Sequence, residues 1–250
     1  MIPIKSESEI QAMRLACKIT AAALAYAGEM VRPGVTTREI DRAIGDYIRS
    51  MGATPTFLNY NGFPANACIS INEVVIHGIP DSRRIMDGDI VSIDIGASVG
   101  GFTGDSARTF PAGNISEEAA RLIEVTERSF WEGMKFARAG FRVPDISRAI
   151  EECVKANGYS VVTAYTGHGV GAKLHEEPEV PNFVLPRGAP RPRLYAGMTL
   201  AVEPMVNAGR PGVIRLDDGW TVVTEDGSLS AHYENTILIR DGEPEILTVV

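Results

Sequence analysis

The sequence predicts an α+β fold of two similar halves, in which an antiparallel sheet is covered by helices. Residues 34–44 match residues 140–150, and residues 85–94 match residues 194–203, with glycine on glycine and the same apolar spacing. In each half, helical patterns come first and alternating strand patterns follow. No strand alternates regularly with a single crossover helix, so a doubly wound parallel sheet is not indicated. We expect one domain, residues 1–250, with pseudo-twofold symmetry between halves at about 1–112 and 113–250.

The helices of both halves are predicted from capping signals as well as from apolar spacing. Ser6 with Glu9 and Thr36 with Glu39 have the spacing of a capping box, in which side chain and backbone bond each other reciprocally. In the second half, Ser116 precedes two glutamates, which favours a helix start because acids complement the helix dipole. These signals predict helices that begin near residues 7, 37 and 117.

A hairpin is predicted where apolar residues alternate before a glycine-rich turn. Asp94 lies in the alternating run, and residues 96–101 supply the turn. If the turn centres on Val99 and Gly100, Asp94 faces Asp105 across an antiparallel ladder. Because both halves have helices followed by strands, we also expect the two halves to share one sheet. Facing like charges destabilise a ladder, so we expect a cation between these two carboxylates.

The composition limits the class of protein. The chain has 250 residues, 44% hydrophobic and 22% charged, which is ordinary for a globular protein. A net charge of −8 and a pI of about 5.1 argue against a general binder of nucleic acids or anionic membranes. Three cysteines without metal-type spacing, no signal-peptide pattern and no long apolar run fit a reducing cytoplasm.

Several acidic residues are expected in the core, where their negative charges would need cations. Asp94 and Glu203 occupy matching positions of the repeat, and each is expected to end an apolar strand. If four carboxylates lay close together without metal, their mutual repulsion would raise some of their pKa values. Two divalent cations would balance the negative charges of all four. Any one acid alone is more simply read as a surface charge. The matching positions favour a metal-dependent hydrolase, with ligands that suit Mn, Fe, Co or Zn. The carboxylates are Asp94, Asp105, Glu203 and Glu234, and His168, between two glycines, is the candidate nitrogen ligand.

Histidines add a second matched pair. His77 and His175 both open an H-x-x-P pattern, which predicts symmetric positions on either side of the acids. A single histidine is usually a structural residue, and the matched pattern favours a shared functional role. His232 precedes Glu234 by two residues and would share its strand face, either behind the site or in an ordinary structural role.

Six segments, in order along nearly the whole chain, carry a family resemblance. The sequence resembles the type I methionine aminopeptidases. The resemblance implies the pita-bread (creatinase/aminopeptidase-like) fold, which agrees with the repeat. Helix signals from Ser6 onward and the lack of a long insertion in the second half favour type I without an N-terminal extension. The segments are residues 70–80, 104–105, 167–171, 175–178, 203–207 and 233–236.

The resemblance also implies roles for individual residues. Glu203 would shuttle the proton of a water held by two metal ions, which attacks the scissile carbonyl. His175 would stabilise the tetrahedral intermediate, and His77 would contact the scissile amide or its leaving nitrogen. The two divalent ions (Co2+, Mn2+, Fe2+ or Zn2+) would be held by Asp94, Asp105, His168, Glu203 and Glu234, with Asp105 and Glu234 bridging.

The resemblance further implies a pocket for a methionine side chain. Leu174 stands where the family usually has an aromatic residue, and Asn235 stands where a histidine often follows the last glutamate. Neither departure removes an implied metal ligand, so hydrolysis is implied more firmly than pocket selectivity. The pocket residues would be Tyr60, Phe63, Cys68, Leu174 and Trp220.

Together these observations predict a cytoplasmic, monomeric aminopeptidase that removes the initiator methionine from nascent proteins when the second residue is small. Its partners would be nascent N-termini and, by resemblance alone, the ribosome. Two alternatives remain open at this stage. One is a proline-directed peptidase of the same fold, which usually carries a further N-terminal domain. The other is a non-catalytic binding protein, although such proteins lose metal ligands that are all present here.

Overall fold

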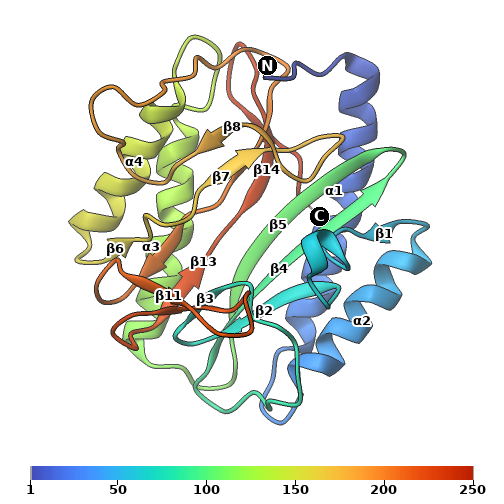
Figure 1. Cartoon of the computed structure of the whole chain (residues 1–250), viewed down its shortest axis with the longest axis vertical. Helices are drawn as coiled ribbons and strands as arrows, with labels where there is room; N and C mark the ends of the chain where they lie inside the picture. The colour runs from blue at the N-terminus through green and yellow to red at the C-terminus, as the bar shows by residue number, and fades with distance from the viewer. Residues whose placement is uncertain (1, 250) are drawn as a thin grey trace.

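The computed structural model describes residues 2–249 and has the predicted α+β architecture. Two pairs of α-helices cover a central set of strands from the outside, and strands of both halves meet between them (Figure 1). Every strand pair within residues 2–249 is antiparallel, as predicted. The helices are α1 (Glu7–Met30), α2 (Thr37–Ser50), α3 (Glu117–Met134) and α4 (Val143–Ala156).

The predicted helix starts are confirmed. Ser6 caps α1 and Thr36 caps α2, and each forms the complete capping box with the glutamate three residues later. Ser116 caps α3, where its side chain accepts a hydrogen bond from the backbone N–H of Ala119. Local side-chain chemistry therefore fixes where these helices begin.

The internal repeat is visible in backbone hydrogen bonds. The backbone N–H of Gly34 donates to the carbonyl of Ile85, and that of Gly140 donates to the carbonyl of Leu194. Both glycines have positive φ angles, 92° and 95°, which side-chain-bearing residues rarely adopt. Ile85 and Leu194 are both fully buried. Equivalent positions of the two halves thus make equivalent contacts.

The central hairpin of the first half has a different register from the predicted one. Asp94 pairs with Ala107, and Asp105 pairs with Gly96, so the two acids lie diagonally on one face instead of facing each other. The turn consists of Gly100 and Gly101, with φ angles of 60° and 83°. Such a two-residue turn requires positive φ at both positions and matches the strand twist, so the glycine pair sets the register.

The strands of the first half include this long hairpin. Asp94 lies in the middle of its strand, so the expectation that it ends a strand is wrong. Each strand of the hairpin is ten residues long, and Asp94 and Asp105 lie in the central parts of the two strands. The elements are β1 (Thr54–Pro55), the 3-10 helix η1 (Tyr60–Gly62), β2 (Ala67–Ile71), β3 (Val74–Ile76), β4 (Ile90–Val99) and β5 (Phe102–Pro111).

The strands of the second half are shorter. Glu203 directly follows an apolar strand, as predicted, and Glu234 directly precedes another. The elements are β6 (Ser160–Val161), β7 (Gly167–Gly169), β8 (Glu176–Val180), β9 (Thr199–Val202), β10 (Met205–Asn207), β11 (Val213–Arg215), β12 (Val222–Thr224), β13 (Ser230–His232), β14 (Asn235–Leu238) and β15 (Glu245–Ile246).

The strands within residues 2–249 form four hydrogen-bonded sheets, so the expectation of one shared sheet is wrong. One sheet joins β1, β2, β4 and β5, and the largest has the order β15-β14-β9-β7-β8. Between these two sheets, the backbone N–H of Glu234 donates to the carbonyl of Ala107 at 2.9 Å. The irregular backbone next to Glu203 and Glu234 interrupts the ladders where the acids enter the interior.

Each half has its own apolar core. One cluster includes Ile40, Ile44 and Ile48 of α2 and the apolar residues of β4 on the face opposite Asp94. A second cluster is formed mainly by α3, α4 and the strands of the second half, with Phe130 fully buried in it. A third cluster joins residues of α1 to Val170, Ala201 and Leu238 and so links the halves. No helix in the described part of the chain is long and apolar enough to cross a membrane.

Candidate active site

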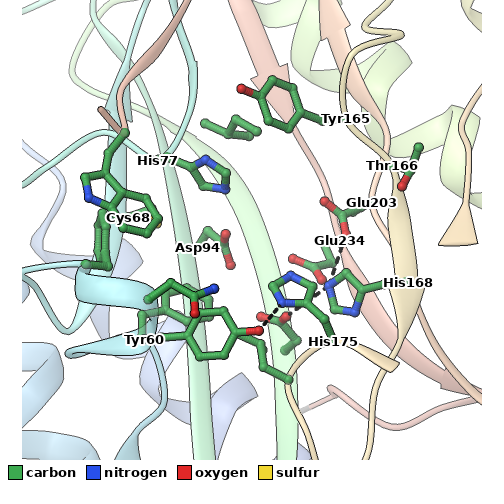
Figure 2. A pocket seen from close by; sticks show the side chains of 17 residues that line it. Tyr60, Cys68, His77, Asp94, Tyr165, Thr166, His168, His175, Glu203 and Glu234 are labelled. Atoms are coloured by element: carbon green, nitrogen blue, oxygen red, sulfur yellow. Dashed lines mark hydrogen bonds and ion pairs between the residues drawn. The ribbon is translucent and has the colours of Figure 1, made fainter. Parts of the chain in front are cut away.

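The five predicted metal-binding residues come together from both halves of the chain. They line one cavity of about 280 Å³ between the halves. Figure 2 shows the side chains of Asp94, His168, Glu203 and Glu234 turned toward one another. Strands β4 and β5 contribute one acid each from the first half, and β7, the end of β9 and the start of β14 contribute the rest. The five residues are Asp94, Asp105, His168, Glu203 and Glu234.

The ligand atoms of this group lie close enough together to bind a common metal ion. The Nε2 atom of His168 lies 3.5 Å from Oε1 of Glu203 and 3.7 Å from Oδ2 of Asp105. One side-chain ligand atom from each of Asp105, His168 and Glu234 lies within 4.8 Å of the others. Three oxygens are fully buried and have no hydrogen-bond partner among residues 2–249, namely Oδ1 of Asp94, Oδ1 of Asp105 and Oε1 of Glu234.

Burial dominates the electrostatics of the carboxylates. Removal from water raises the pKa of Asp94 to about 7. Burial, and then the negative charges of neighbouring carboxylates, raise the pKa values of Asp105, Glu203 and Glu234 well above their usual range. Charged carboxylates are therefore disfavoured in this cavity unless cations are present.

The candidate nitrogen ligand is in the right protonation state for a metal. Burial, and secondarily the charge of His175, lower the pKa of His168 to about 3, so its ring is neutral at pH 7. Its Nδ1 lies 2.9 Å from the carbonyl oxygen of Gly169, which leaves Nε2 toward the carboxylates. Neutral imidazole held by a backbone carbonyl is a common arrangement for a metal-binding histidine.

These residues fit divalent metal ions. Buried carboxylate oxygens without partners and a neutral imidazole form an oxygen and nitrogen ligand set. Cys68 lies opposite Asp94 in the β2–β4 ladder and also lines the cavity. Burial and the nearby carboxylates raise the pKa of its thiol well above the usual value, so it stays protonated and does not act as a thiolate ligand.

A layer of polar contacts behind the acids holds the two halves in register. The Thr236 hydroxyl accepts a hydrogen bond from the backbone N–H of Asp105 at 3.0 Å and donates to the carbonyl of Asp105 at 2.8 Å. The Arg108 guanidinium donates to the carbonyl of Glu234 and, at 2.8 Å, to Oδ1 of Asn235. Asn235, which stands where the family often has a histidine, is fully buried, and its side chain binds Arg108.

The matched histidines both line the cavity, in different surroundings. His77 has a left-handed backbone with φ of 58°, a strained conformation for a residue with a side chain. Burial lowers the pKa of His77 to about 4. The ring of His175 lies 4.2 Å from that of His168, centroid to centroid. In the view of Figure 2, His77 and His175 lie on different sides of Asp94.

The residues predicted to surround a methionine side chain also lie together. Phe63, Cys68 and Leu174 are buried in one apolar cluster, and Tyr60 and Trp220 pack against it. The rings of Phe63 and Trp220 meet edge to face at 5.2 Å. All five residues line the same cavity as the acids.

Other residues that line the cavity or lie behind it were not predicted from the sequence or were left undecided. Phe57 belongs to the apolar cluster, and Tyr165 packs its ring edge against His77 at 5.8 Å. Both lie in irregular segments, where apolar spacing gives no signal. His232 is buried behind the acids, with Nε2 3.9 Å from Oε2 of Glu203 and without a hydrogen-bond partner among residues 2–249.

The chain is similar to known proteins over its whole length. The chain is 56% identical over 251 residues to the methionine aminopeptidase of Clostridium perfringens, covering 100% of both chains. Its structure resembles that of the methionine aminopeptidase from Rickettsia prowazekii, with a TM-score of 0.96, 40% identity and full coverage of both chains.

A more distant likeness shows the shared fold alone. The prolidase from Pyrococcus furiosus matches with a TM-score of 0.79 and 23% identity, over 99% of this chain and 65% of that one. The sequence profile of Metallopeptidase family M24 matches residues 11–241. The chain belongs to metallopeptidase family M24.

Proposed function

We infer that this chain is a metal-dependent aminopeptidase that removes the initiator methionine from new proteins when the second residue is small. One observation carries the inference: a buried cluster of four carboxylates and a neutral histidine opens into the same cavity as a compact apolar cluster. The full-length similarity to methionine aminopeptidases supports the same conclusion. Such a cavity can hold an apolar side chain beside a hydrolytic centre.

The metal ions are proposed from the ligand set. Two divalent ions, drawn from Co2+, Mn2+, Fe2+ and Zn2+, would be held by Asp94, Asp105, His168, Glu203 and Glu234. Oxygen and nitrogen ligands suit all of these ions. When bound, such ions lower the pKa of water and polarise a carbonyl. The buried oxygens without partners on Asp94, Asp105 and Glu234 support this assignment.

Glu203 is proposed to move the proton of the reaction. Burial and its acidic neighbours raise the pKa of Glu203, and bound cations would keep its carboxylate ionised, so that it could accept a proton from the attacking water and hold it. The proton would then pass to the nitrogen of the leaving amine. Its position supports this role, because the carboxylate lines the cavity beside His168 and has the buried His232 behind it.

The two matched histidines are proposed to contact the substrate. His175 would donate a hydrogen bond to the oxygen that becomes negatively charged during the attack. His77 would contact the scissile amide or its leaving nitrogen. Burial lowers the pKa of both rings, so each is neutral at pH 7 and can donate one proton in a hydrogen bond.

The apolar cluster is proposed to select the first residue. The unbranched thioether side chain of methionine would pack among the rings and Leu174, which suits its flexible, polarisable chain. The side chains of this pocket are Tyr60, Phe63, Cys68, Leu174 and Trp220, together with Phe57.

The setting of the reaction follows from the substrate. We propose a cytoplasmic monomer that acts on nascent N-termini, with the ribosome as a partner. The chain would work as a single catalytic domain of two halves, about 1–112 and 113–250, because the site needs acids from both. Contacts between the halves at Ala107, Glu234 and Thr236 support this.

A metal titration tests the proposal. Chelator-stripped protein is titrated separately with Mn2+, Co2+, Fe2+ and Zn2+, and release of methionine is measured on Met-Gly and Met-Ala peptides. We expect no release without metal and maximal release near two equivalents. Xaa-Pro peptides, assayed in parallel, should be poor substrates. Preferential cleavage of Xaa-Pro peptides would make the chain a proline-directed peptidase, and metal binding without any cleavage would make it a binding protein.

A further inference from the structure

Tyr60 and His175 are joined by a hydrogen bond across the mouth of the cavity. The Tyr60 hydroxyl lies 2.7 Å from Nδ1 of His175, although the residues are 115 positions apart in the sequence (Figure 2). The His175 ring makes no other hydrogen bond to a residue in the range 2–249. Its other nitrogen, Nε2, is left for whatever enters the cavity.

The backbone around Tyr60 adopts a strained conformation that aims the ring. Asn59 and Asn61, on either side of Tyr60, both have left-handed backbones, with φ angles of 66° and 49°. Such conformations cost free energy and persist only where surrounding contacts impose them. The turn is closed by hydrogen bonds from the N–H of Asn59 to the carbonyl of Phe63 and from the N–H of Tyr60 to the carbonyl of Phe57. This segment holds Tyr60 firmly.

The direction of the hydrogen bond follows from the chemistry of the two groups. Burial and the negative charge of Asp105 raise the pKa of Tyr60, so its hydroxyl keeps its proton. A neutral histidine ring has one protonated nitrogen and one nitrogen with a free lone pair, and the Tyr60 hydroxyl lies 2.7 Å from Nδ1. A phenol hydroxyl that donates to Nδ1 leaves the ring proton on Nε2.

We propose that Tyr60 is a positioning residue, which donates its hydroxyl proton to Nδ1 of His175 and so keeps the His175 ring proton on Nε2, facing the cavity. The proposal rests on the proposed function, in which His175 donates to the developing negative charge. A ring with the opposite tautomer would present a lone pair there instead of a proton, and would repel that charge.

The same residue connects substrate selection to catalysis. The Tyr60 ring packs against the apolar cluster of Phe57, Phe63, Cys68 and Leu174, and Leu174 directly precedes His175 in the chain. A side chain bound in this pocket therefore contacts the residue that orients His175. Selection for the first residue should then appear in kcat as well as in KM.

Nitrogen-15 NMR of histidine-labelled protein tests the tautomer directly, in the metal-free and zinc-loaded states. His175 is assigned by the loss of its signals in His175→Asn. We expect unprotonated Nδ1 and protonated Nε2 in the unchanged protein, and movement of both signals toward a mixture of tautomers in Tyr60→Phe. Tyr165→Phe removes a hydroxyl from the same cavity and should leave the His175 signals in place.

Kinetics of the same variants separate positioning from pocket packing. Tyr60→Phe keeps the ring, so we expect kcat on Met-Ala peptides to fall about tenfold while KM changes less than twofold. Tyr60→Leu removes the ring as well and should also raise KM. Tyr47→Phe, which loses a hydroxyl outside the cavity, is the control for folding and should match the unchanged protein.

The outcomes distinguish this proposal from the proposed function. A His175 ring protonated at Nδ1 in the unchanged protein, or signals unaffected by Tyr60→Phe, overturns the positioning role. A tenfold loss of kcat with an unchanged tautomer overturns it too. If the metal-loaded protein releases no methionine, the proposed function fails, while the NMR result still decides the tautomer.

Discussion

The acidic cluster and the apolar pocket share one cavity but are built in different ways. The acids lie in or next to strands, and polar contacts such as those of Thr236 and Arg108 hold them from behind. The pocket is formed largely by irregular segments, including the strained turn around Tyr60 and the loop at Trp220. Rigid strands suit a reaction centre that tolerates little displacement, whereas loops suit a surface that selects among side chains.

The two regions also differ in their effect on stability. Packing of Phe63 and Leu174 in the pocket stabilises the fold because it removes apolar surface from water. The acidic cluster opposes folding unless cations are bound, because buried carboxylates lose hydration and repel one another. Changes in the two regions should therefore be distinguishable by their effects on activity, stability and metal binding.

The largest effect is expected at the proton-transferring carboxylate. Glu203→Gln keeps the size of the side chain but removes the group that would accept and return a proton. We expect kcat for methionine release to fall about 10²- to 10⁴-fold, with KM nearly unchanged. Steady-state kinetics at saturating metal, with metal content measured on the same sample, gives both numbers.

A remote charge change provides the control for that variant. Glu29→Gln neutralises an exposed glutamate in α1 and should keep full activity. If Glu203→Gln retained more than a tenth of the activity at full metal content, proton transfer would have to be assigned to another group.

The second effect is a pH dependence of stability in metal-free protein. The folded pKa of Asp94 is about 7, against about 3.9 in an unfolded chain, and Asp105, Glu203 and Glu234 are also raised. The folded state then holds protons that the unfolded state has released, so these acids lower stability as pH rises. The buried His77, His168 and His232, with folded pKa values of about 4, 3 and 3, have the opposite effect, which fades as pH rises above the unfolded pKa of about 6.5.

Between about pH 7 and 8 the carboxylates dominate, because the histidine effect has largely faded and the buried thiols of Cys17 and Cys68 act mainly near the unfolded pKa of about 8.5. We expect metal-free protein to lose about 1.4 kcal/mol of unfolding free energy per pH unit for each extra proton held by the folded state. Urea unfolding between about pH 7 and pH 8 measures this loss. Two equivalents of Zn2+ should remove it, because bound cations keep the carboxylates ionised in the folded state. An equal slope with and without zinc would mean that the metal does not bind these acids.

The comparison also explains what could be predicted from the sequence. Asp94 could be found because a charged residue within an apolar alternation stands out, and its match with Glu203 gave a second, independent signal. Helix starts at Ser6 and Thr36 depend on neighbours within three residues, so local chemistry was sufficient. The repeat thus marked two of the acids, Asp94 and Glu203, whereas the roles of Asp105, Glu234 and His168 were implied by the family resemblance.

What escaped prediction depends on tertiary placement. The hairpin register was wrong because the turn at Gly100 and Gly101 lies one residue later than assumed, and that small change moved Asp94 from facing Asp105 to a diagonal position. Phe57 lies in an irregular segment without periodicity, and its place in the pocket follows only from the fold. The pocket therefore depends on loop geometry that residue spacing does not specify.

The third effect is smaller and tests the pocket. Phe63→Leu shortens one wall while leaving the acids in place, so kcat/KM for Met-Ala peptides should fall about tenfold with metal affinity unchanged. Phe130→Leu is the matched control, because Phe130 is also buried but lies in the core of the second half. Both variants should lose stability, and only Phe63→Leu should lose selectivity for methionine over leucine or norleucine. Equal selectivity in the two variants would contradict the assignment of this pocket.

The smallest effect lies outside both regions and shows what stability loss alone does to activity. Thr36→Ala removes the side chain that accepts from the Glu39 N–H and donates to its carboxylate, which should cost about 1 kcal/mol of unfolding free energy. Since α2 contributes no residue to the cavity lining, kcat/KM at 25 °C should stay within twofold of the unchanged protein. A larger loss of activity would show that the cavity is sensitive to general weakening of the first half. The tenfold loss expected for Phe63→Leu would then no longer report on the pocket itself.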